Sequence, residues 1–565
     1  MNQFKEAIIK LLANNDVEIE EGIISTPPNP EMGDYAVPCF QMAAKLKNAP
    51  PKVAEELAQK IDLSGNEFIS GVKNFGPYLN FFVNKSKFIE SVLSKIIAEK
   101  ENYGTGIEKS KILIESPGPN TNKPLHLGHL RNVFIGASAI QIFRKLGNDV
   151  SHIDIVNDRG IHICKSMLAY QKFGECKEPD IKSDHFVGKY YVLYSQKEKE
   201  NPELEEEARE MLRKWEAGDP ETIELWKKMK KWSLDGMNQT YERLNFVAEK
   251  VYYESEQYAR GKKIVLEGVE KGLFTKNDEG CIIIDLTEEG FGEKVLLRAD
   301  GTSVYVTQDI STAKARYEDY NMDKIIYVVA TEQNYHFKVL FKVLEKIGFE
   351  FAKNLYHMAY GMVNLPDGKM KSREGTVVDA DELLDQMQAM AKEEIVKRHT
   401  GLSEKEIDKR SNIISQGALR FFILKVDSHK DMTYDPKEAI SFEGETGPYV
   451  QYVHARCCAI LRKYNSEIGS DIDYGLLVED SELEMVKLLS QFGIKIEEAA
   501  KNYKPSTVAQ YLIQVAQQFN EFYHKCQVIG EDAELTKVRI RIVESVKLVI
   551  KMGLELLAID APEEM

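Results

Sequence analysis

The loop that starts after Glu115 constrains the fold more than any other part of the sequence, because its two flanks differ sharply. KILIE (Lys111–Glu115) before it is short and β-prone, whereas NVFIGASAIQIFRKLG after it is apolar at helical spacing and closes on Gly147. Between them, SPGPNTNKPLHLGHLRN is rich in Pro, Gly and Asn and places His126 and His129 three positions apart. A strand, a tight loop and a helix in this order form the part of an α/β fold where phosphate ligands usually bind.

The same alternation continues along the chain and predicts an α/β fold with a doubly wound parallel sheet. DVSHIDIVNDRG indicates a second strand with its loop, and IHICKSMLAYQKFG indicates the helix that follows. We expect three further buried strands at Gly280–Leu286, Ser303–Asp309 and Lys324–Ala330, the last two followed by helical patterns.

The remaining regions predict separate domains, since 565 residues are too many for one hydrophobic core. Residues 1–108 combine helical patterns with strand-like stretches such as GPYLNFFVN, which predicts a small α+β domain. Residues 109–378 contain the sheet, with a charged helical or mixed insertion near residues 170–295. Residues 379–565 show long amphipathic stretches almost throughout, which indicates an all-α bundle.

Composition narrows the functional classes. No apolar run approaches the ~18–20 residues that span a bilayer, and the N-terminal MNQFKEAIIKLLANN predicts a helix and not a signal peptide. Seven scattered cysteines without a C-x-x-C pair argue against structural zinc and for a reducing, cytoplasmic location. The net charge of −16, from 74 Lys+Arg and 90 Asp+Glu, weighs mildly against a nucleic-acid partner. We expect a monomer with no membrane association and no resident metal.

The common phosphate-binding fingerprints are missing. Neither G-x-G-x-x-G nor G-x-x-x-x-G-K-[ST] occurs, and H-E-x-x-H and G-x-S-x-G are absent as well. Any phosphate-binding site must therefore be built from another motif.

The histidine pair is the candidate for such a phosphate-binding motif. On a helix, residues i and i+3 share a face, so His126 and His129 can point at one ligand. The positive end of the helix disfavours imidazolium, which leaves two neutral N–H donors suited to orienting a triphosphate. Gly128 between them allows a nucleotide to approach the backbone closely. Taken alone, an H-x-x-H is more often one loop cap and one core residue, or a metal pair.

The sequence around the pair resembles a known signature. P-L-H-L-G-H-L-R after a strand resembles the H-I-G-H signature of class I aminoacyl-tRNA synthetases, a shorter form of which occurs in nucleotidylyltransferases. The second class I signature, K-M-S-K-S, is matched by Lys369-Met370-Lys371-Ser372-Arg373. Ser372 stands where the family has a lysine, and Lys371 comes one place early. Arginyl-tRNA synthetases often depart in this way and carry a lysine before the histidines, as Lys123 does here.

The resemblance to arginyl-tRNA synthetases extends over nearly the whole chain. It implies a Rossmann-like catalytic domain with a helical insertion, an anticodon-binding bundle and an N-terminal domain that contacts the outer corner of the tRNA. It implies catalytic roles for His126, His129, Lys123, Lys369 and Lys371. The implied ATP-binding residues are Pro119, Asn120, Thr121, Asn122, Lys123, Pro124, Leu125, His126, Leu127, Gly128, His129, Met370, Lys371, Ser372 and Arg373.

The same resemblance implies an arginine site at the carboxyl ends of the strands. A guanidinium needs fixed carboxylates, because burying it unpaired costs several kcal/mol. Asp309 and Tyr305 are the expected guanidinium partners, and Asn120 and Gln333 the expected contacts to the α-amino and carboxyl end. Glu115 is expected to contact arginine as well. In isolation, Asp309 would be read as a helix cap and Tyr305 as a core residue.

An RNA-binding region is expected in the C-terminal bundle. GALRFFILKV resembles the D-A-L-R anticodon-binding domain, with Gly417 in place of the aspartate, and GPYVQYVHAR resembles a second segment of it. Tyr449, Tyr452 and Arg456 place aromatics near a cation, which suits unstacked anticodon bases. Met565 is expected to help cover the anticodon loop.

These features together predict an arginine–tRNA ligase that works in two steps. ATP with Mg²⁺ activates L-arginine to an adenylate, and the 2′-hydroxyl of the terminal adenosine of tRNA(Arg) then attacks it. The family usually needs bound tRNA for the first step. Three alternatives remain: a cysteinyl-type synthetase, a nucleotidylyltransferase and a non-catalytic RNA-binding relative.

Overall fold

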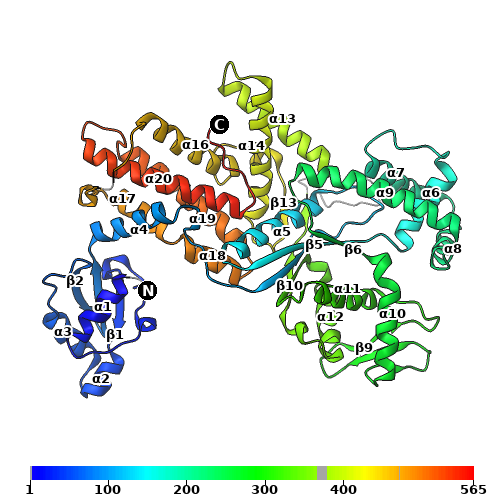
Figure 1. Ribbon diagram of the computed structural model, residues 1–565, viewed down its shortest axis with the longest axis horizontal. Coiled ribbons are helices and arrows are strands. Elements are labelled where there is room, and N and C mark those ends of the chain that lie inside the picture. The colour runs from blue at the N-terminus through cyan, green and yellow to red at the C-terminus, as the bar shows by residue number, and fades with distance from the viewer. Residues whose placement is uncertain (1–2, 365–377, 470) are drawn as a thin grey trace. The chain divides into compact units, whose positions relative to one another are not determined.

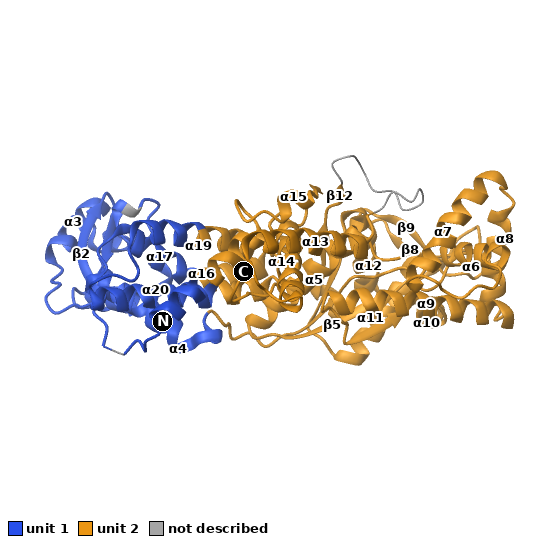
Figure 2. Cartoon of the chain, turned by 90° about the horizontal axis from the view of Figure 1, so that it is seen from above, with its two compact units in different colours: residues 1–103, 457–491, 517–549 blue, residues 104–456, 492–516, 550–565 orange. Residues whose placement is uncertain are grey.

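The computed structural model describes residues 3–364, 378–469 and 471–565. It divides into two compact units, shown in blue and orange in Figure 2. Unit 1 contains residues 1–103, 457–491 and 517–549, and unit 2 contains residues 104–456, 492–516 and 550–565. Three long helices contribute to both units, so this division does not follow the domain limits expected from the sequence. These helices are α16 (Gly447–Tyr464), α19 (Ser506–Lys525) and α20 (Ala533–Leu556).

A five-stranded sheet forms the centre of unit 2. Its strand order is β11-β10-β4-β5-β6, and every neighbouring pair is parallel, as the sequence predicted. The strands are rich in Ile, Val and Leu because both faces of a parallel sheet are covered (Figure 1). They are β4 (Lys111–Glu115), β5 (Asp149–Val156), β6 (Lys250–Tyr253), β10 (Lys324–Ala330) and β11 (Leu355–Tyr360).

The strand order creates a switch point between β4 and β10. From β4 the chain adds β5 and β6 on one side, and it then returns to add β10 and β11 on the other. Ligands of such sheets bind beyond the carboxyl ends of the strands at this point. The connecting helices are α5 (Leu127–Lys145), α6 (Ile161–Phe173), α7 (Ser183–Glu200), α8 (Leu204–Glu216), α9 (Pro220–Arg243), α10 (Glu254–Glu270), α11 (Tyr305–Tyr320) and α12 (Asn334–Ile347).

Two strand predictions need correction. Gly280–Leu286 does contain a strand, β8 (Ile282–Leu286), but it pairs antiparallel with β7 (Thr275–Lys276) and β9 (Gly292–Leu297) in a separate small sheet. Ser303–Asp309 is not a strand, because α11 begins at Tyr305. The local preference of Val and Thr for strands is overridden there by a helical face that buries Ile310 and Ala313 in the core.

The interval near residues 170–295 is not one inserted block. It contains β6, which belongs to the parallel sheet. The helices α7, α8 and α9 lie between β5 and β6 along the chain, and the small antiparallel sheet lies between β6 and β10. Because β6 has only four residues, its pattern does not stand out among the charged helices.

The N-terminal part of unit 1 has the α+β character predicted for it. Its antiparallel sheet has the order β1-β3-β2, and Leu79 and Phe81 of the central strand are fully buried. Ile8 and Ala54 from two helices pack in the same core. The elements are α1 (Gln3–Ala13), β1 (Tyr35–Pro38), α2 (Phe40–Leu46), α3 (Pro50–Lys60), β2 (Ile69–Phe75), β3 (Tyr78–Val83) and α4 (Lys85–Glu99).

The region after residue 378 is almost entirely helical, as predicted. A two-residue parallel pair, β12 (Val363–Asn364) with β13 (Met432–Thr433), joins it to the chain that leaves β11. None of the helices in the described ranges is long and apolar enough to cross a membrane. Besides α16, α19 and α20, the region after residue 378 contains the helices α13 (Ala380–Arg398), α14 (Glu404–Leu424), α15 (Pro436–Ala439), α17 (Asp480–Ser490) and α18 (Phe492–Lys501).

Gly417 explains one departure from the D-A-L-R pattern. A Cβ at this position of α14 would lie 2.5 Å from the amide nitrogen and oxygen of Gln451 on α16. The amide of Gln451 donates to the carbonyl of Asp560 at 2.8 Å, so it cannot easily move. Close packing of α14 against α16 therefore leaves no room for an aspartate at position 417.

We expect Gly417→Ala to destabilise the protein by about 1–3 kcal/mol, as overpacked cores do. The added methyl group would displace the Gln451 amide and weaken its bond to Asp560. Thermal unfolding followed by circular dichroism measures the loss. Gly22→Ala is the control, because a Cβ there meets nothing within 4 Å. Equal melting temperatures for the two variants would contradict this account of Gly417.

Candidate active site

The loop between β4 and α5 is held in place from several sides. The backbone of Thr121 donates to the carbonyl of Asn157 at 3.1 Å, and Asn157 donates back to Pro119 at 2.9 Å. Ser233 of α9 donates its hydroxyl to the Thr121 carbonyl at 2.6 Å. Gly188 of α7 lies against Pro124, since a Cβ there would come within 2.6 Å of its ring. The inserted helices thus fix the loop that carries Lys123 and the histidines.

The two histidines form one unit at the start of α5. His126 is the residue before the helix, and its backbone N–H donates to Nδ1 of His129 at 3.1 Å. Their ring centroids are 3.8 Å apart. A Cβ on residue 128 would lie 3.0 Å from Cε1 of His126, so Gly128 leaves the space that this imidazole occupies. Sequence reasoning assigned that space to a nucleotide and missed the histidine ring.

Burial keeps both imidazoles neutral. It lowers the pKa of His126 to about 3, with a smaller contribution from the Lys123 ammonium. It also holds the pKa of His129 well below its usual range, helped by His126 and Lys123. Since Nδ1 of His129 accepts a hydrogen bond, its proton is on Nε2. Nδ1 of His126 is buried and has no hydrogen-bond partner among the described residues.

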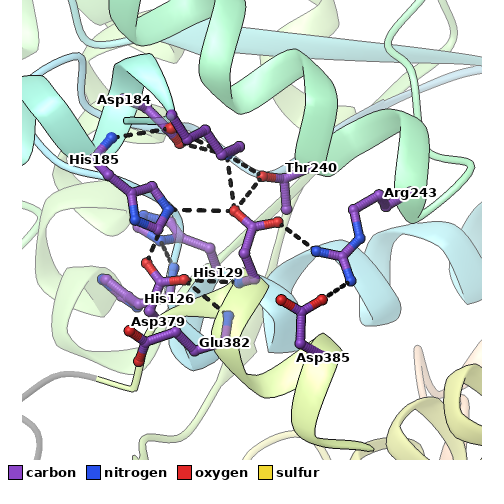
Figure 3. Close-up of polar contacts among 11 residues, drawn as sticks. His126, His129, Asp184, His185, Thr240, Arg243, Asp379, Glu382 and Asp385 are labelled. Atoms are coloured by element: carbon purple, nitrogen blue, oxygen red, sulfur yellow. Dashed lines mark hydrogen bonds and ion pairs between the residues drawn. The ribbon is translucent and has the colours of Figure 1, made fainter. Parts of the chain in front are cut away.

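The chain on either side of residues 365–377 is tied to this turn. Leu127 donates to the carbonyl of Val378 at 3.0 Å, and Ala380 donates to Leu125 at 3.0 Å. Figure 3 shows His126, His129 and Asp379 side by side. The five expected residues Lys369, Met370, Lys371, Ser372 and Arg373 lie outside the described residues.

Arg131 of α5 connects the helix to the chain that precedes residue 365. Its guanidinium is fully buried and donates to the carbonyls of Gly361 (2.8 Å) and Met362 (3.1 Å). It also donates to the carbonyls of Ser428 (3.0 Å) and Lys430 (2.8 Å). Burial lowers its pKa to about 10, so it remains charged at neutral pH. Arg131 belongs to the H-L-G-H-L-R pattern, yet sequence reasoning gave it no role.

Glu115 has a partner from its own chain. Its carboxylate, buried at the end of β4, forms an ion pair with the fully buried Arg316 of α11. The rings of Tyr252 and Tyr327 lie 5.3 and 5.5 Å from that guanidinium. Burial raises the pKa of Glu115, and Arg316 opposes this rise. The carboxylate expected to contact arginine therefore already binds a guanidinium.

The other expected arginine-site residues lie on α11 and in the segments that follow β4 and β10. Asp309 of α11 accepts from Nε2 of His336 at 2.6 Å. Tyr305, at the first position of α11, is 66% exposed, and Gln333 follows β10 and is also exposed. Asn120 forms an isolated parallel backbone bridge with Asn157. The structure thus leaves Tyr305 and Gln333 accessible.

Glu254 is an acidic residue that sequence reasoning missed. It follows β6 directly and is the first residue of α10. Burial raises its pKa to about 8, with further contributions from the nearby Asp309 and Asp158 carboxylates. Its Oε2 is buried without a hydrogen-bond partner among the described residues. The sequence signal for Glu254 was an acid directly after the short strand KVYY. That strand was assigned to the insertion, so its carboxyl end was not considered.

The expected RNA-binding residues lie on α16 and at the C-terminus. Tyr452 is 37% exposed, and the Arg456 guanidinium lies 4.7 Å from its ring and donates to its hydroxyl at 3.1 Å. Tyr449 is half-buried one turn earlier. The carbonyl of Met565 accepts from His399 at 2.5 Å, and its side chain is half-buried. These contacts hold the C-terminal residue in a defined place.

One side-chain cluster among the described residues has the donor types of a metal site. Asp184, His185 and Asp381 place one ligand atom each within 4.8 Å of one another. The ammonium of Lys182 already lies 2.9 Å from Asp184 and 2.8 Å from Asp381, so a cation of the protein occupies this position.

A parallel sheet with a histidine-bearing loop at its switch point is the arrangement expected for the catalytic domain of a class I aminoacyl-tRNA synthetase. The family model for the class I (R) catalytic domain matches residues 92–435. Models for the DALR anticodon binding domain and the arginyl tRNA synthetase N terminal domain match residues 450–565 and 1–83. The chain belongs to the arginyl-tRNA synthetase family.

Individual relatives agree with this assignment. The arginine–tRNA ligase of Treponema denticola is 46% identical over 96% of this chain and 94% of its own. That of Bacteroides thetaiotaomicron is 43% identical, with 94% of each chain covered. The structure is similar to that of Thermus thermophilus arginyl-tRNA synthetase, with a TM-score of 0.82, 25% identity, and 100% and 99% of the two chains covered.

The histidine environment predicts opposite titrations in one spectrum. With ¹³C-labelled histidine, the His126 and His129 ring signals should stay unchanged from pH 8 to 5.5, because burial lowers both pKa values. His185 should titrate above its usual range, because its hydrogen bond to Asp381 raises its pKa. Replacement of each histidine by asparagine assigns the signals.

The lowered pKa of His126 also makes the stability of the protein depend on pH. Below about pH 6.5 the unfolded chain binds a proton at residue 126 that the folded protein does not, so the free energy of unfolding falls by roughly 1.4 kcal/mol per pH unit. His126→Asn should lose less stability between pH 7 and 5.5 than the wild type. A His126 signal that titrates near pH 6.5 would contradict the neutral pair.

Proposed function

We propose how this arginine–tRNA ligase binds its substrates and carries out its two steps. Arginine, ATP and tRNA(Arg) are the substrates, and ATP is bound over the HLGH turn. The observation that carries this proposal is the pair of half-buried, neutral imidazoles beside Lys123 at the start of α5. Neutral N–H donors and a nearby ammonium can stabilise charge on a triphosphate without an unfavourable histidine protonation.

In the first step, the arginine carboxylate attacks the α-phosphate in line and pyrophosphate leaves. Nε2–H of His129 donates to the phosphate, and Lys123, desolvated by burial, neutralises the developing charge. His126 can donate through whichever ring nitrogen faces the nucleotide. Residues 119–129 and 370–373 form the ATP site, and Lys369 and Lys371 assist the departure of pyrophosphate. Mg²⁺ bound to the ATP phosphates supplies further charge neutralisation.

Arginine is selected by the acidic residues at the strand ends. Asp309 and Glu254 are the guanidinium acceptors, because Glu254 has a buried carboxylate oxygen without a partner among the described residues. Tyr305, Asn120 and Gln333 complete the site. Glu115 serves it indirectly, since Arg316 neutralises its carboxylate. The pocket thereby offers two acids to one substrate cation.

In the second step, the 2′-hydroxyl of the terminal adenosine of tRNA attacks the carbonyl carbon of the arginyl-adenylate, the ester bond forms and AMP leaves. Tyr449, Tyr452, Arg456 and Met565 contact the anticodon side, and tRNA must be bound before arginine is activated. The N-terminal domain contacts the outer corner of the tRNA. We further propose that the enzyme is a monomer of the cytoplasm.

Pyrophosphate exchange into ATP tests the reaction. Each amino acid is assayed with and without tRNA(Arg), and exchange should require arginine and be strongest with tRNA present. Exchange with cysteine, or with no amino acid, would favour the alternative enzymes. No arginine-dependent exchange even with tRNA would overturn the proposal.

Three acid-to-amide variants separate the roles of the strand-end acids. Asp309→Asn and Glu254→Gln should raise the KM for arginine about 10- to 100-fold, because each removes a charge-assisted hydrogen bond worth about 1.5–3 kcal/mol. Glu115→Gln should instead lower the melting temperature, since it leaves Arg316 buried without its carboxylate. Steady-state exchange kinetics and thermal unfolding measure the two effects.

Glu332→Gln is the control, since this exposed acid lies beside Gln333 and has no described ion pair. It changes the net charge near the site without touching the acids that bind arginine. An unchanged KM in Asp309→Asn or Glu254→Gln would remove that residue from the guanidinium site. A KM rise in Glu332→Gln of the same size would mean that the effect is a general one of charge.

A separate pair of variants tests the anticodon side. Tyr452→Ala should raise the KM for tRNA roughly tenfold, because stacking of one base contributes about 1–3 kcal/mol. Deletion of Met565 should weaken tRNA binding as well. Arginine KM at saturating tRNA should stay the same in both. Equal tRNA KM values for variants and wild type would exclude these contacts.

A further inference from the structure

Three helix ends meet beside the HLGH turn (Figure 3). The first turns of α7 and α13 carry Asp184 and Asp381, and the last turn of α9 carries Arg243. Carboxylates are favoured at helix N-termini because unpaired backbone N–H groups point at them. The cluster is therefore placed so that the inserted helices and the chain that follows residue 377 can be joined by charge.

Asp381 is the centre of this cluster. Its Oδ2 accepts from Lys182 at 2.8 Å and from the Thr240 hydroxyl at 3.0 Å, and it faces Nε2 of His185 at 3.4 Å. Its Oδ1 accepts from Arg243 at 3.0 Å. Burial favours the neutral acid, but these donors hold the pKa of Asp381 well below its usual range. One ionised carboxylate thus connects α7, α9 and α13.

A bound metal ion is not needed to explain the cluster. The Lys182 ammonium lies 3.0 and 2.9 Å from the two oxygens of Asp184 and 2.8 Å from the hydroxyl of Thr240. With its bond to Asp381, it has partners for all three of its protons. The arrangement is that of a structural cross-link and not of a ligand site.

The cross-link reaches the histidine pair through the backbone. Asp379 caps α13 by accepting from the N–H groups of Asp381 (2.8 Å) and Glu382 (3.1 Å). The neighbouring residue, Ala380, donates to the carbonyl of Leu125, directly before His126. Moving the first turn of α13 therefore moves the strand-like pairing that holds the HLGH turn.

We propose that Asp381 is a positioning residue for adenylate formation: by tying the first turn of α13 to α7 and α9, it holds the HLGH turn at the distance the α-phosphate requires. In this role Asp381 acts through the contacts of α13 and not through a contact of its own with arginine or ATP. This inference rests on the proposed roles of His126 and His129. A displacement of about 1 Å at a reacting group can cost 100-fold in rate.

Asp381→Asn is the direct test. Single-turnover adenylate formation, with tRNA bound, should slow on the order of 10- to 100-fold. The KM for arginine should stay within about twofold, because the strand-end acids are untouched. Asp381→Glu, which keeps the charge, should recover part of the rate. Glu382→Gln, an exposed acid one residue further along α13 without a described side-chain bond, is the matched control.

A double-mutant cycle identifies the partner. If Asp381 acts through the cross-link, Lys182→Met should slow the same step. Asp381→Asn should then slow it by a smaller factor in the Lys182→Met background than in the wild type. Full additivity of the two losses would overturn the cross-link. A normal rate in Asp381→Asn, or the same slowing in Glu382→Gln, would overturn the positioning role.

Folding and function are kept apart by two further measurements. If Asp381→Asn is unfolded at the assay temperature, Arg243→Met decides, because it removes one partly exposed donor to Oδ1. A smaller loss in the same rate constant supports the proposal, and an unchanged rate overturns it. Wild-type enzyme without arginine-dependent exchange would instead overturn the proposed function itself.

Discussion

Two backbone hydrogen bonds connect the parts of this catalytic site. Leu127 binds the carbonyl of Val378 and Ala380 binds that of Leu125, so the first turn of α5 is paired with the start of α13. These residues are far apart in sequence, and their pairing brings the chain after residue 377 to the histidine pair. Arg131 makes the corresponding connection to the chain before residue 365 through the carbonyls of Gly361 and Met362, and it also binds the carbonyls of Ser428 and Lys430.

Burial and internal ion pairs then set the charge of the site. The imidazoles of His126 and His129 are neutral because burial disfavours their charged forms and the Lys123 ammonium lies nearby. Glu115 is a third acid near the strand ends, but Arg316 neutralises it. Asp309 binds His336, whereas Oε2 of Glu254 has no hydrogen-bond partner among the described residues. Charge selection here depends as much on which groups the protein pairs internally as on which it leaves open.

Much of this could be predicted from the sequence. The alternation after Lys111 predicted the parallel sheet, and the P-L-H-L-G-H-L-R pattern placed His126 and His129 at a helix start. The long amphipathic stretches after residue 379 likewise predicted the helical C-terminal region. The prediction of a strand at Ser303–Asp309 was wrong, because burial of one face of α11 outweighs the local preference of Val and Thr.

Local pattern therefore determined which elements exist and which residue types reach the strand ends. It determined the histidine spacing, the helix that follows and the family resemblance. Only the tertiary structure decided that Glu115 is paired within the protein, because Arg316 reaches it from about two hundred residues away along the chain, as its residue number shows. Only the tertiary structure also joined Asp381 to Lys182 and Arg243. Such pairings depend on distances in space, and no local property of the sequence encodes them.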